Sequence, residues 1–444
     1  MVNRFAHRMQ REQQAGNKDR RFNPGFESKN VEQPSMPFLP ETPRQKKMLV
    51  VLILFLAFVG IDIFFGARYS AERDSNFRAF CWDAHTFWKL KPSYEGEAWG
   101  HSIHTDAGGF RGDDNPPLQS KHDFRIITFG DSRTYGFSVR DHEAYSYVLQ
   151  EELRKRRIDA EVINAGVHGY SAVQCRARLS QMLRYKPDAA VFAPGYNDRR
   201  YLVIRPVDAD RSIPWIARTR RVVDVLQWSN TVFALFYEVG RHKLKAIQEN
   251  PPGLDEVQVR VSEETFRDEL MRMADLCREH GIQPVFLRIY QDPAAFALVE
   301  AADRLNRSGE HRQAVEMIEE SDGAIPDRSY AMSRWALGRA YRRLGDEAKA
   351  RVAFVSHEPL GSLFGESVLR SEEVYFSIFQ EIANAKNIPL ADAKEAMGIR
   401  IDDPREADNE FQSFFVDECH YSADGHRRIG EALATLFTDL FNKQ

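Results

Sequence analysis

Two short polar groups, far apart in the chain, hold side chains that together could carry out acyl transfer. Residues 130–132 read Gly-Asp-Ser and residues 417–420 read Asp-Glu-Cys-His. A serine hydroxyl is a weak nucleophile near neutral pH unless a base takes its proton, and the base needs a group that orients it. We therefore predict that Ser132 attacks, that His420 shuttles the proton, and that Asp417 fixes the imidazole tautomer and stabilises the imidazolium.

The same chemistry needs hydrogen-bond donors for the oxyanion of a tetrahedral intermediate, each worth about 10²–10³ in rate. Three candidates are the backbone N–H of Ser132, the backbone N–H of Gly169 and the side-chain amide of Asn197. We interpret Gly166 as a turn glycine instead. These donors can act together only if the segments that carry them end at one edge of one sheet.

The segments before these residues are short and apolar, which is typical of buried parallel strands. We expect strands at residues 124–129, 160–164, 189–194, 284–290 and 388–391. Helices should alternate with them, at residues 143–156, 172–185, 263–280, 371–386 and 427–441. Repeated strand, glycine-bearing loop and helix indicate a doubly wound α/β sheet, in which ligands lie at the carboxyl ends of the strands.

At these residues the chain resembles the SGNH hydrolases, also called the GDSL esterase/lipase family. Four blocks match in the family's order, at residues 130–132, 164–169, 195–198 and 417–420. The resemblance extends over residues 124–204, 263–292 and 371–441. It implies a flavodoxin-like three-layer α/β/α sandwich with a parallel sheet, and a serine esterase that forms an acyl-Ser132 intermediate without a metal or organic cofactor.

Several further polar residues stand next to the four blocks. Arg133 occupies the position where the name motif has Leu, which bears on the substrate rather than on membership of the family. Arg133 and His168 are possible pocket residues, and so is Asp198, which we expect to brace the loop of Asn197. For His426 we favour a role at the start of the last helix over a catalytic one.

The first 67 residues differ in composition from the rest of the chain. Residues 1–47 are polar and proline-rich, which predicts a disordered tail, and residues 48–67 are apolar except for Asp62, long enough to cross a bilayer. Basic residues directly before the apolar stretch favour a cytoplasmic amino terminus. We expect a single-pass protein of the inner (cytoplasmic) membrane whose catalytic domain is periplasmic or otherwise extracytoplasmic, with Asp62 near the outer end of the span.

Three other segments lie outside the pattern of the sheet. Residues 68–123 are expected to be a loop-rich lead-in, and residues 205–255 an insertion into the hydrolase domain of residues 124–444. Residues 298–357 contain two copies of a tetratricopeptide-like pattern at an offset of 36 residues. These helical hairpins could bind a protein partner or simply pack on the main domain, and the sequence leaves both readings open.

The overall composition limits the remaining possibilities. The chain has 43% hydrophobic and 28% charged residues with a formal net charge of -4, so it does not look like a nucleic-acid-binding protein. Its cysteines are far apart and show no metal-binding spacing, which leaves their disulfide state open; they are Cys81, Cys175, Cys277 and Cys419.

The expected function is that of a membrane-anchored serine esterase. The lead-in with residues 109–112 (Gly-Phe-Arg-Gly) also resembles membrane-anchored bacterial SGNH proteins associated with extracellular polysaccharides, so the expected substrate is an acylated carbohydrate, carrying O-acetyl groups. Two alternatives stay open: a lipase or thioesterase acting on acyl chains, and a non-catalytic scaffold that uses the tetratricopeptide-like insert. Hydrolysis and acyl transfer are not distinguished by the sequence.

Overall fold

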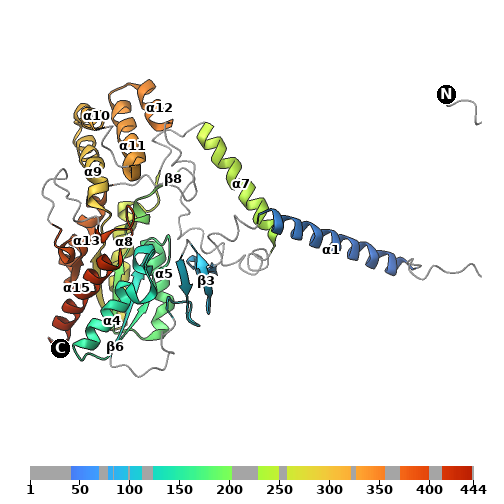
Figure 1. Cartoon of the computed structure of the whole chain (residues 1–444), viewed down its shortest axis with the longest axis horizontal. Helices are drawn as coiled ribbons and strands as arrows, with labels where there is room; N and C mark the ends of the chain where they lie inside the picture. The colour runs from blue at the N-terminus through green and yellow to red at the C-terminus, as the bar shows by residue number, and fades with distance from the viewer. Residues whose placement is uncertain are drawn as a thin grey trace, which may run out of the picture. The chain divides into compact units, whose positions relative to one another are not determined.

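The computed structural model describes residues 42–69, 79–83, 85–98, 101–112, 124–202, 229–249, 258–321, 327–355, 371–399 and 413–442. The chain divides into two compact units, residues 1–59 and 60–444, which are described separately. The predicted disordered tail lies almost entirely outside the described residues, as does most of the insertion at 205–255. Figure 1 shows the course of the chain.

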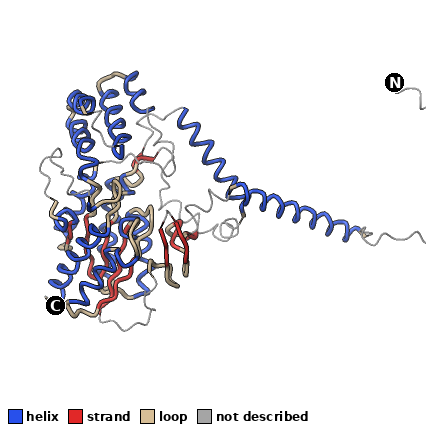
Figure 2. Tube along the Cα trace, viewed as in Figure 1, coloured by secondary structure: helices blue, strands red, loops and turns tan. Residues whose placement is uncertain are grey.

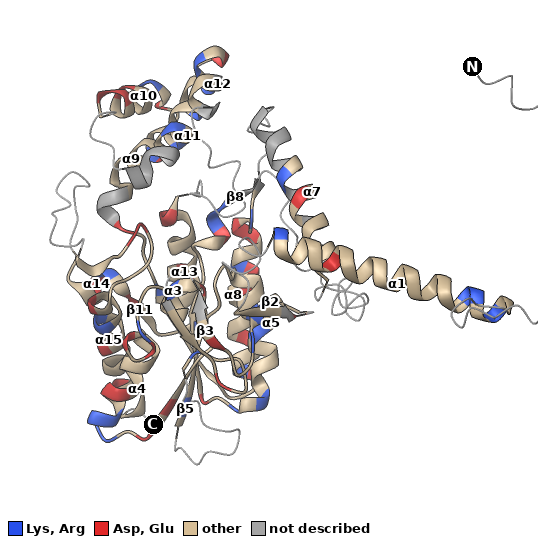
Figure 3. Ribbon diagram, turned by 45° about the vertical axis from the view of Figure 1, so that its right-hand side comes forward, with Lys and Arg blue, Asp and Glu red and all other residues tan. Residues whose placement is uncertain are grey.

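Helix α1 (Pro43–Arg68) contains the predicted span. It has 26 residues, a mean hydropathy of 2.9 over its most apolar window, and no buried residue before its end. Figure 3 shows Lys and Arg at its beginning and a largely uncharged ribbon after them. By length and composition α1 could cross a bilayer.

The centre of the second unit is a parallel sheet of five strands in the order β11-β10-β7-β5-β6. The strands are β5 (Phe124–Gly130), β6 (Ala160–Asn164), β7 (Ala189–Ala193), β10 (Gln283–Arg288) and β11 (Leu390–Asp392). Counted along the chain this is the order 2-1-3-4-5 of flavodoxin-like sheets, with the switch point between the first and third strands. The predicted fold class is confirmed.

Helices cover both faces of the sheet, so its strands are buried on both sides (Figure 2). On one face α4 (Tyr145–Lys155) packs against α15 (Ala423–Phe441), and on the other α8 (Glu263–Glu279) packs against α5 (Ala172–Met182) and α13 (Glu372–Lys386). All five residues of β6 and all five of β7 are buried. This explains why β7 is a continuous apolar run, whereas β6 also buries the polar side chains of Glu161 and Asn164.

The last helix begins earlier than the predicted residue 427. The hydroxyl of Ser422 accepts a hydrogen bond from the N–H of Gly425 and so caps a helix that begins at Ala423. Gly425 lies inside this helix, and a Cβ added there would lie 2.5 Å from the carbonyl oxygen of Phe414. The glycine therefore marks a close approach of two segments rather than a loop.

The prediction of a loop-rich lead-in was wrong for its described part. Residues 80–90 form an antiparallel pair, β1 (Phe80–Asp83) with β2 (Phe87–Leu90), and residues 95–104 form a second, β3 (Glu95–Ala98) with β4 (His101–His104). Four-residue strands with turns between them give little periodicity, so their sequence resembles that of a loop. Among the described aromatic residues of this segment, Phe87 and Phe110 are buried in the core of the domain, and Phe80, Trp88 and Tyr94 pack against it.

The tetratricopeptide-like segment forms four helices with a small apolar core of its own. They are α9 (Pro293–Ser308), α10 (His311–Glu320), α11 (Asp327–Arg343) and α12 (Glu347–Val355). Gly309 and Gly345 end the first helix of each hairpin at positive φ, 89° and 81°, and Ala314 and Ala350 are both buried. The offset of 36 residues therefore corresponds to a structural repeat.

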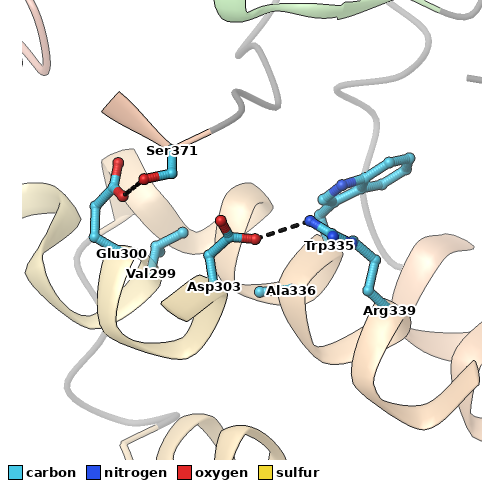
Figure 4. A pocket seen from close by; sticks show the side chains of 7 residues that line it. All are labelled: Val299, Glu300, Asp303, Trp335, Ala336, Arg339 and Ser371. Carbon is cyan, nitrogen blue, oxygen red and sulfur yellow. Dashed lines mark hydrogen bonds and ion pairs between the residues drawn. The ribbon is translucent and has the colours of Figure 1, made fainter. Parts of the chain in front are cut away.

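A crevice between α9 and α11 is the feature drawn in Figure 4. An ion pair of 2.8 Å between Arg339 and Asp303 closes one side of it, and a hydrogen bond of 2.7 Å from Ser371 to Glu300 closes the other. Its volume is about 10 Å³. That is room for roughly one water molecule, so it cannot hold an organic substrate.

Candidate active site

Ser132 lies in a tight turn directly after the central strand β5. Asp131 caps the one-turn helix α3 (Ser132–Tyr135), because its carboxylate accepts a hydrogen bond of 2.9 Å from the N–H of Arg133. A Cβ at position 130 would lie 2.0 Å from the hydroxyl oxygen of Thr134, so only glycine fits there. The sequence Gly-Asp-Ser thus builds the turn that presents the hydroxyl at the carboxyl end of β5.

The structure brings Ser132, His420 and Asp417 together as a connected set. The Nε2 atom of His420 lies 2.7 Å from Oγ of Ser132, and its Nδ1 lies 2.7 Å from Oδ2 of Asp417. The other oxygen of Asp417 accepts hydrogen bonds from the N–H groups of Cys419 and His420, at 2.9 and 2.8 Å. Both ring nitrogens of His420 are therefore engaged, one with the hydroxyl and one with the carboxylate.

The charges around His420 favour its protonated form. Burial opposes the imidazolium, but the sulfur of Cys419 and the carboxylate of Asp417 outweigh it, so the pKa of His420 lies above its usual range. Burial alone would raise the pKa of Asp417, yet the hydrogen bonds from His420 and the backbone lower it to about 2. Burial raises the pKa of Cys419, so its thiol is neutral near neutral pH and the carboxylate is the lasting source of the effect on His420.

The loops after β5, β6 and β7 end at one edge because these three strands are neighbours in the sheet. Gly169 follows β6 with φ of 76°, and a Cβ there would lie 3.2 Å from the indole of Trp88. The carbonyl of Gly169 accepts a hydrogen bond of 2.7 Å from Arg260, and the indole N–H of Trp88 donates to the carbonyl of His168 at 2.8 Å. These contacts hold the orientation of the peptide groups around Gly169.

Asn197 follows β7 and contacts the nucleophile turn. Its side-chain N–H donates to Oδ2 of Asp131 at 3.3 Å, which links the third loop to the first. Asp198 accepts hydrogen bonds from the N–H groups of Ala172 and Gly195, at 2.8 and 2.9 Å. Asp198 is fully buried, and this burial raises its pKa to about 6.

Arg133 is enclosed beneath the site, with only 2% of its surface exposed. Its guanidinium makes two hydrogen bonds to Asp131, at 3.1 and 2.9 Å, and one of 2.8 Å to the carbonyl of Ile289. It also lies 5.1 Å from the ring centroid of Tyr196, the residue before Asn197. Arg133 thus contacts the base of two loops of the site.

The two remaining histidines differ in their surroundings. His168 packs among aromatic rings, 4.4 Å from the centroid of Tyr135 and 5.4 Å from that of Phe137, and burial holds its pKa well below the usual range. His426 is buried in the first turn of α15 and accepts a hydrogen bond of 3.3 Å from the N–H of Tyr145. His426 therefore joins α15 to α4 rather than facing Ser132.

Sequence reasoning missed two residues of this site, Trp88 and Arg260. Trp88 belongs to the misread lead-in, and Arg260 follows β9 (Gln258–Val259), a two-residue strand paired with β8 (Tyr201–Leu202) beside the insertion. Arg260 also donates to Gln174 at 2.7 Å. A lone arginine or tryptophan outside the four blocks carries no spacing signal, so no pattern in the sequence could have identified either one.

Asp417, Cys419 and His420 could in principle also ligate a metal, because their donor atoms lie within 4.8 Å of one another. In this arrangement Nδ1 and Nε2 of His420 are already directed at Asp417 and Ser132. A metal would have to displace one of these two hydrogen bonds. The geometry of the three residues therefore serves the serine hydroxyl better than an ion.

A protein-family model described as GDSL-like lipase/acylhydrolase matches residues 128–428, more than half of the chain. The comparison with curated proteins gave no match. A lipase/acylhydrolase from Enterococcus faecalis is similar at 15% identity, covering 71% of this chain and 96% of that one, with a TM-score of 0.35.

Two further solved structures are similar over the same extent. One is a psychrotrophic esterase from Pseudoalteromonas sp., at 12% identity, covering 72% of this chain and 100% of that one, with a TM-score of 0.33. The other is a catalytic mutant of an acetylxylan esterase from Geobacillus stearothermophilus, at 11% identity, covering 71% and 95%, with a TM-score of 0.34.

Proposed function

Because the chain belongs to the GDSL-like lipase/acylhydrolase family, we propose that Ser132, His420 and Asp417 cleave or transfer a carboxylic ester through an acyl-serine intermediate. One observation carries the assignment of roles. A single imidazole lies 2.7 Å from the serine hydroxyl on one side and 2.7 Å from a carboxylate on the other. This is the arrangement in which a hydroxyl can lose its proton while it attacks a carbonyl carbon.

The reaction proceeds in two halves. Oγ of Ser132 attacks the ester carbon while its proton moves to Nε2 of His420, and the imidazolium that forms is stabilised by Asp417. The proton then passes to the leaving alcohol, and the acyl group stays on Ser132. A water molecule or a second hydroxyl loses its proton to His420, attacks the acyl-serine and releases the acid or a new ester.

The oxyanion of each tetrahedral intermediate is negative and needs donors that are already oriented. We assign this role to the N–H of Ser132, the N–H of Gly169 and the side-chain amide of Asn197. Two observations support this assignment. The three residues follow neighbouring strands, and the side-chain amide of Asn197 donates to Asp131, which fixes the orientation of that amide.

We further propose that the substrate is an acylated carbohydrate of the cell envelope or an exported polysaccharide, with O-acetyl as the acyl group. Helix α1 supports this proposal, because it is long and apolar enough to anchor the enzyme to a membrane, and the basic residues at its beginning favour a cytoplasmic amino terminus. An anchored enzyme of the extracytoplasmic side would stay near envelope glycans. Residues 298–357 could add a contact with a protein partner.

The proposal is tested by replacing the nucleophile in the full-length, detergent-solubilised chain. Ser132→Ala should lower kcat for p-nitrophenyl acetate by about 10⁴-fold or more and abolish labelling by a fluorophosphonate probe. Ser180→Ala is the matched control, because Ser180 is an exposed serine on α5 whose hydroxyl donates to the carbonyl of Arg176 at 3.4 Å. Unchanged turnover in Ser132→Ala would refute the assignment.

Hydrolysis and transfer are separated by their products. The enzyme is incubated with a mixture of acetylated and deacetylated oligosaccharides, and the products are analysed by mass spectrometry. Hydrolysis releases free acetate, whereas transfer produces newly acetylated acceptor. A preference for long-chain over acetyl esters would instead favour a lipase or thioesterase and would contradict the proposed substrate.

A further inference from the structure

The single acidic residue of the apolar stretch in α1 is bonded to a segment 167 residues further along the chain. Oδ1 of Asp62 accepts hydrogen bonds from the hydroxyl of Ser229 at 2.5 Å and from the N–H of Thr231 at 2.9 Å. Oδ2 accepts one of 3.0 Å from the side chain of Asn230. A carboxylate in an apolar span is costly unless it is paired, and here the start of helix α7 (Asn230–Glu249) supplies the donors.

Beyond this point α7 continues alongside the last turns of α1 in the same direction. Two turns after Asp62, the hydroxyl of Tyr69 donates to Glu238 at 2.6 Å, and its ring lies 5.5 Å from that of Tyr237. Between these two contacts Ala234 is buried. The start of α7 therefore contacts α1 at Asp62, and a later turn of α7 contacts Tyr69, the residue directly after α1.

Gly66 leaves room for the side chain of Asn230 in its bond to Asp62. A Cβ at this position would lie 2.7 Å from Nδ2 of Asn230, which is the atom bonded to Asp62. Small residues at such contacts are typical of helices that pack within a membrane. Gly60, in the same apolar stretch, has no atom within 4 Å of its added Cβ and so lies outside the contact.

The side of α7 next to this contact exposes apolar side chains. Leu235 and Val239, four residues apart and hence on one face of the helix, are 63% and 45% exposed. On α1 the neighbouring Ile61 and Phe64 are exposed as well. At 1.5 Å per residue, Asp62 lies about 9 Å inside the end of α1 at Arg68. With Arg68 at the membrane surface, Asp62 thus lies within the outer half of a hydrocarbon core about 30 Å thick.

We propose that the first turn of α7 inserts into the outer leaflet of the membrane beside α1, with Asp62 as its docking point and Leu235 against lipid. The occupant of this apolar face is the phospholipid bilayer. The inference rests on the proposed membrane anchoring of α1. It gives the insertion before the fourth sheet strand a function: a second membrane contact that restrains how the hydrolase domain is held over the surface.

The test uses the full-length protein in liposomes of phosphatidylcholine and phosphatidylglycerol. Leu235→Cys labelled with an environment-sensitive fluorophore should emit at shorter wavelength than in water and be quenched by lipids with a nitroxide near the headgroup. The same label at Val352→Cys, an exposed site on α12, should emit as in water. The unsubstituted chain, labelled in parallel, corrects for Cys81 and the other native thiols.

Two glycine variants make the test specific. Gly66→Leu should displace Asn230 and abolish the spectral shift and the quenching at position 235, whereas Gly60→Leu, in open space on the same helix, should retain both. Ester hydrolysis of a soluble substrate should stay unchanged in both variants, which shows that the domain is folded. In Leu235→Cys without a glycine substitution, a label that emits as in water would overturn the proposed insertion of α7. If that protein also resists carbonate extraction, the membrane anchoring by α1 still holds. Release by carbonate would overturn the membrane anchoring as well.

Discussion

His420 is the group whose charge decides when the site can work. Its neutral form must accept the proton of Ser132, and the raised pKa means that this form is lost at a higher pH than for an ordinary histidine. We expect kcat/KM to fall as pH falls through an inflection above about 6.5, the usual pKa of histidine. Asp417, with a pKa of about 2, stays ionised throughout and adds no second inflection there.

Two substitutions identify the source of this shift. Asp417→Asn removes the carboxylate and should move the inflection down and lower kcat by about 10²–10⁴-fold, because the imidazolium loses its stabilising charge. Cys419→Ala should move the inflection less, since the buried thiol is neutral near neutral pH. A pH profile that shifts as far in Cys419→Ala as in Asp417→Asn would contradict this account.

Arg133 is a positioning residue rather than one that faces the substrate. It neutralises Asp131, and Asp131 in turn holds the amide of Asn197 at 3.3 Å. Arg133→Leu should leave a buried carboxylate without its charge partner and lower the free energy of unfolding by about 3–5 kcal/mol. It should also reduce kcat with little change in KM, because the amide is needed in the transition state more than in the ground state.

A second ion pair, at the start of β5, gives the control for Arg133. Arg125 bonds to the buried Glu161 at 2.7 Å, at the opposite end of β5 from Ser132. Arg125→Leu should cost comparable stability in chemical denaturation but leave kcat per folded molecule unchanged. Equal effects of both substitutions on kcat, after correction for the folded fraction, would show that Arg133 acts through stability alone.

At the scale of elements, the hairpin β1–β2 supports the loop of Gly169. Trp88→Phe keeps most of the ring next to Gly169 but removes the N–H that bonds to the carbonyl of His168. The loss of one such bond is worth about 1 kcal/mol, so we expect kcat to fall by up to about tenfold. Lys89→Ala, on the same strand, removes an ion pair of 3.4 Å to Asp83 and should leave kcat as it is. Initial-rate measurements at saturating ester distinguish the two.

The hairpin β1–β2 also illustrates which features of the site could not be predicted from the sequence. The parallel strands could be predicted because burial on both faces favours short, mostly apolar segments. The loops after them could be predicted because Gly130 and Gly169 occupy positions that only glycine fits without strain. Trp88 and Arg260 could not be found this way. Each acts through a contact made by the fold between segments about 80 and 90 residues apart, and such contacts leave no local pattern.

At the scale of the whole molecule, the proposed membrane anchoring by α1 leads to a prediction about the side on which the hydrolase domain lies. The beginning of α1 carries Arg44, Lys46 and Lys47, and the charge bias of such segments sets the orientation of a single span. We therefore expect residues after Arg68 to be extracytoplasmic. Their composition does not oppose this, because the chain beyond residue 47 is acidic overall.

The orientation of the proposed span can be determined by labelling one introduced thiol in spheroplasts. Val352→Cys places a 70% exposed thiol on α12, where a membrane-impermeant maleimide added to spheroplasts should label it without lysis. Arg44→Glu with Lys46→Glu and Lys47→Glu removes the positive bias and should reduce that labelling, because part of the population then inserts with the opposite orientation. The unsubstituted chain gives the background from Cys81. Labelling that appears only after lysis would place the domain in the cytoplasm and remove the argument for an envelope glycan as substrate.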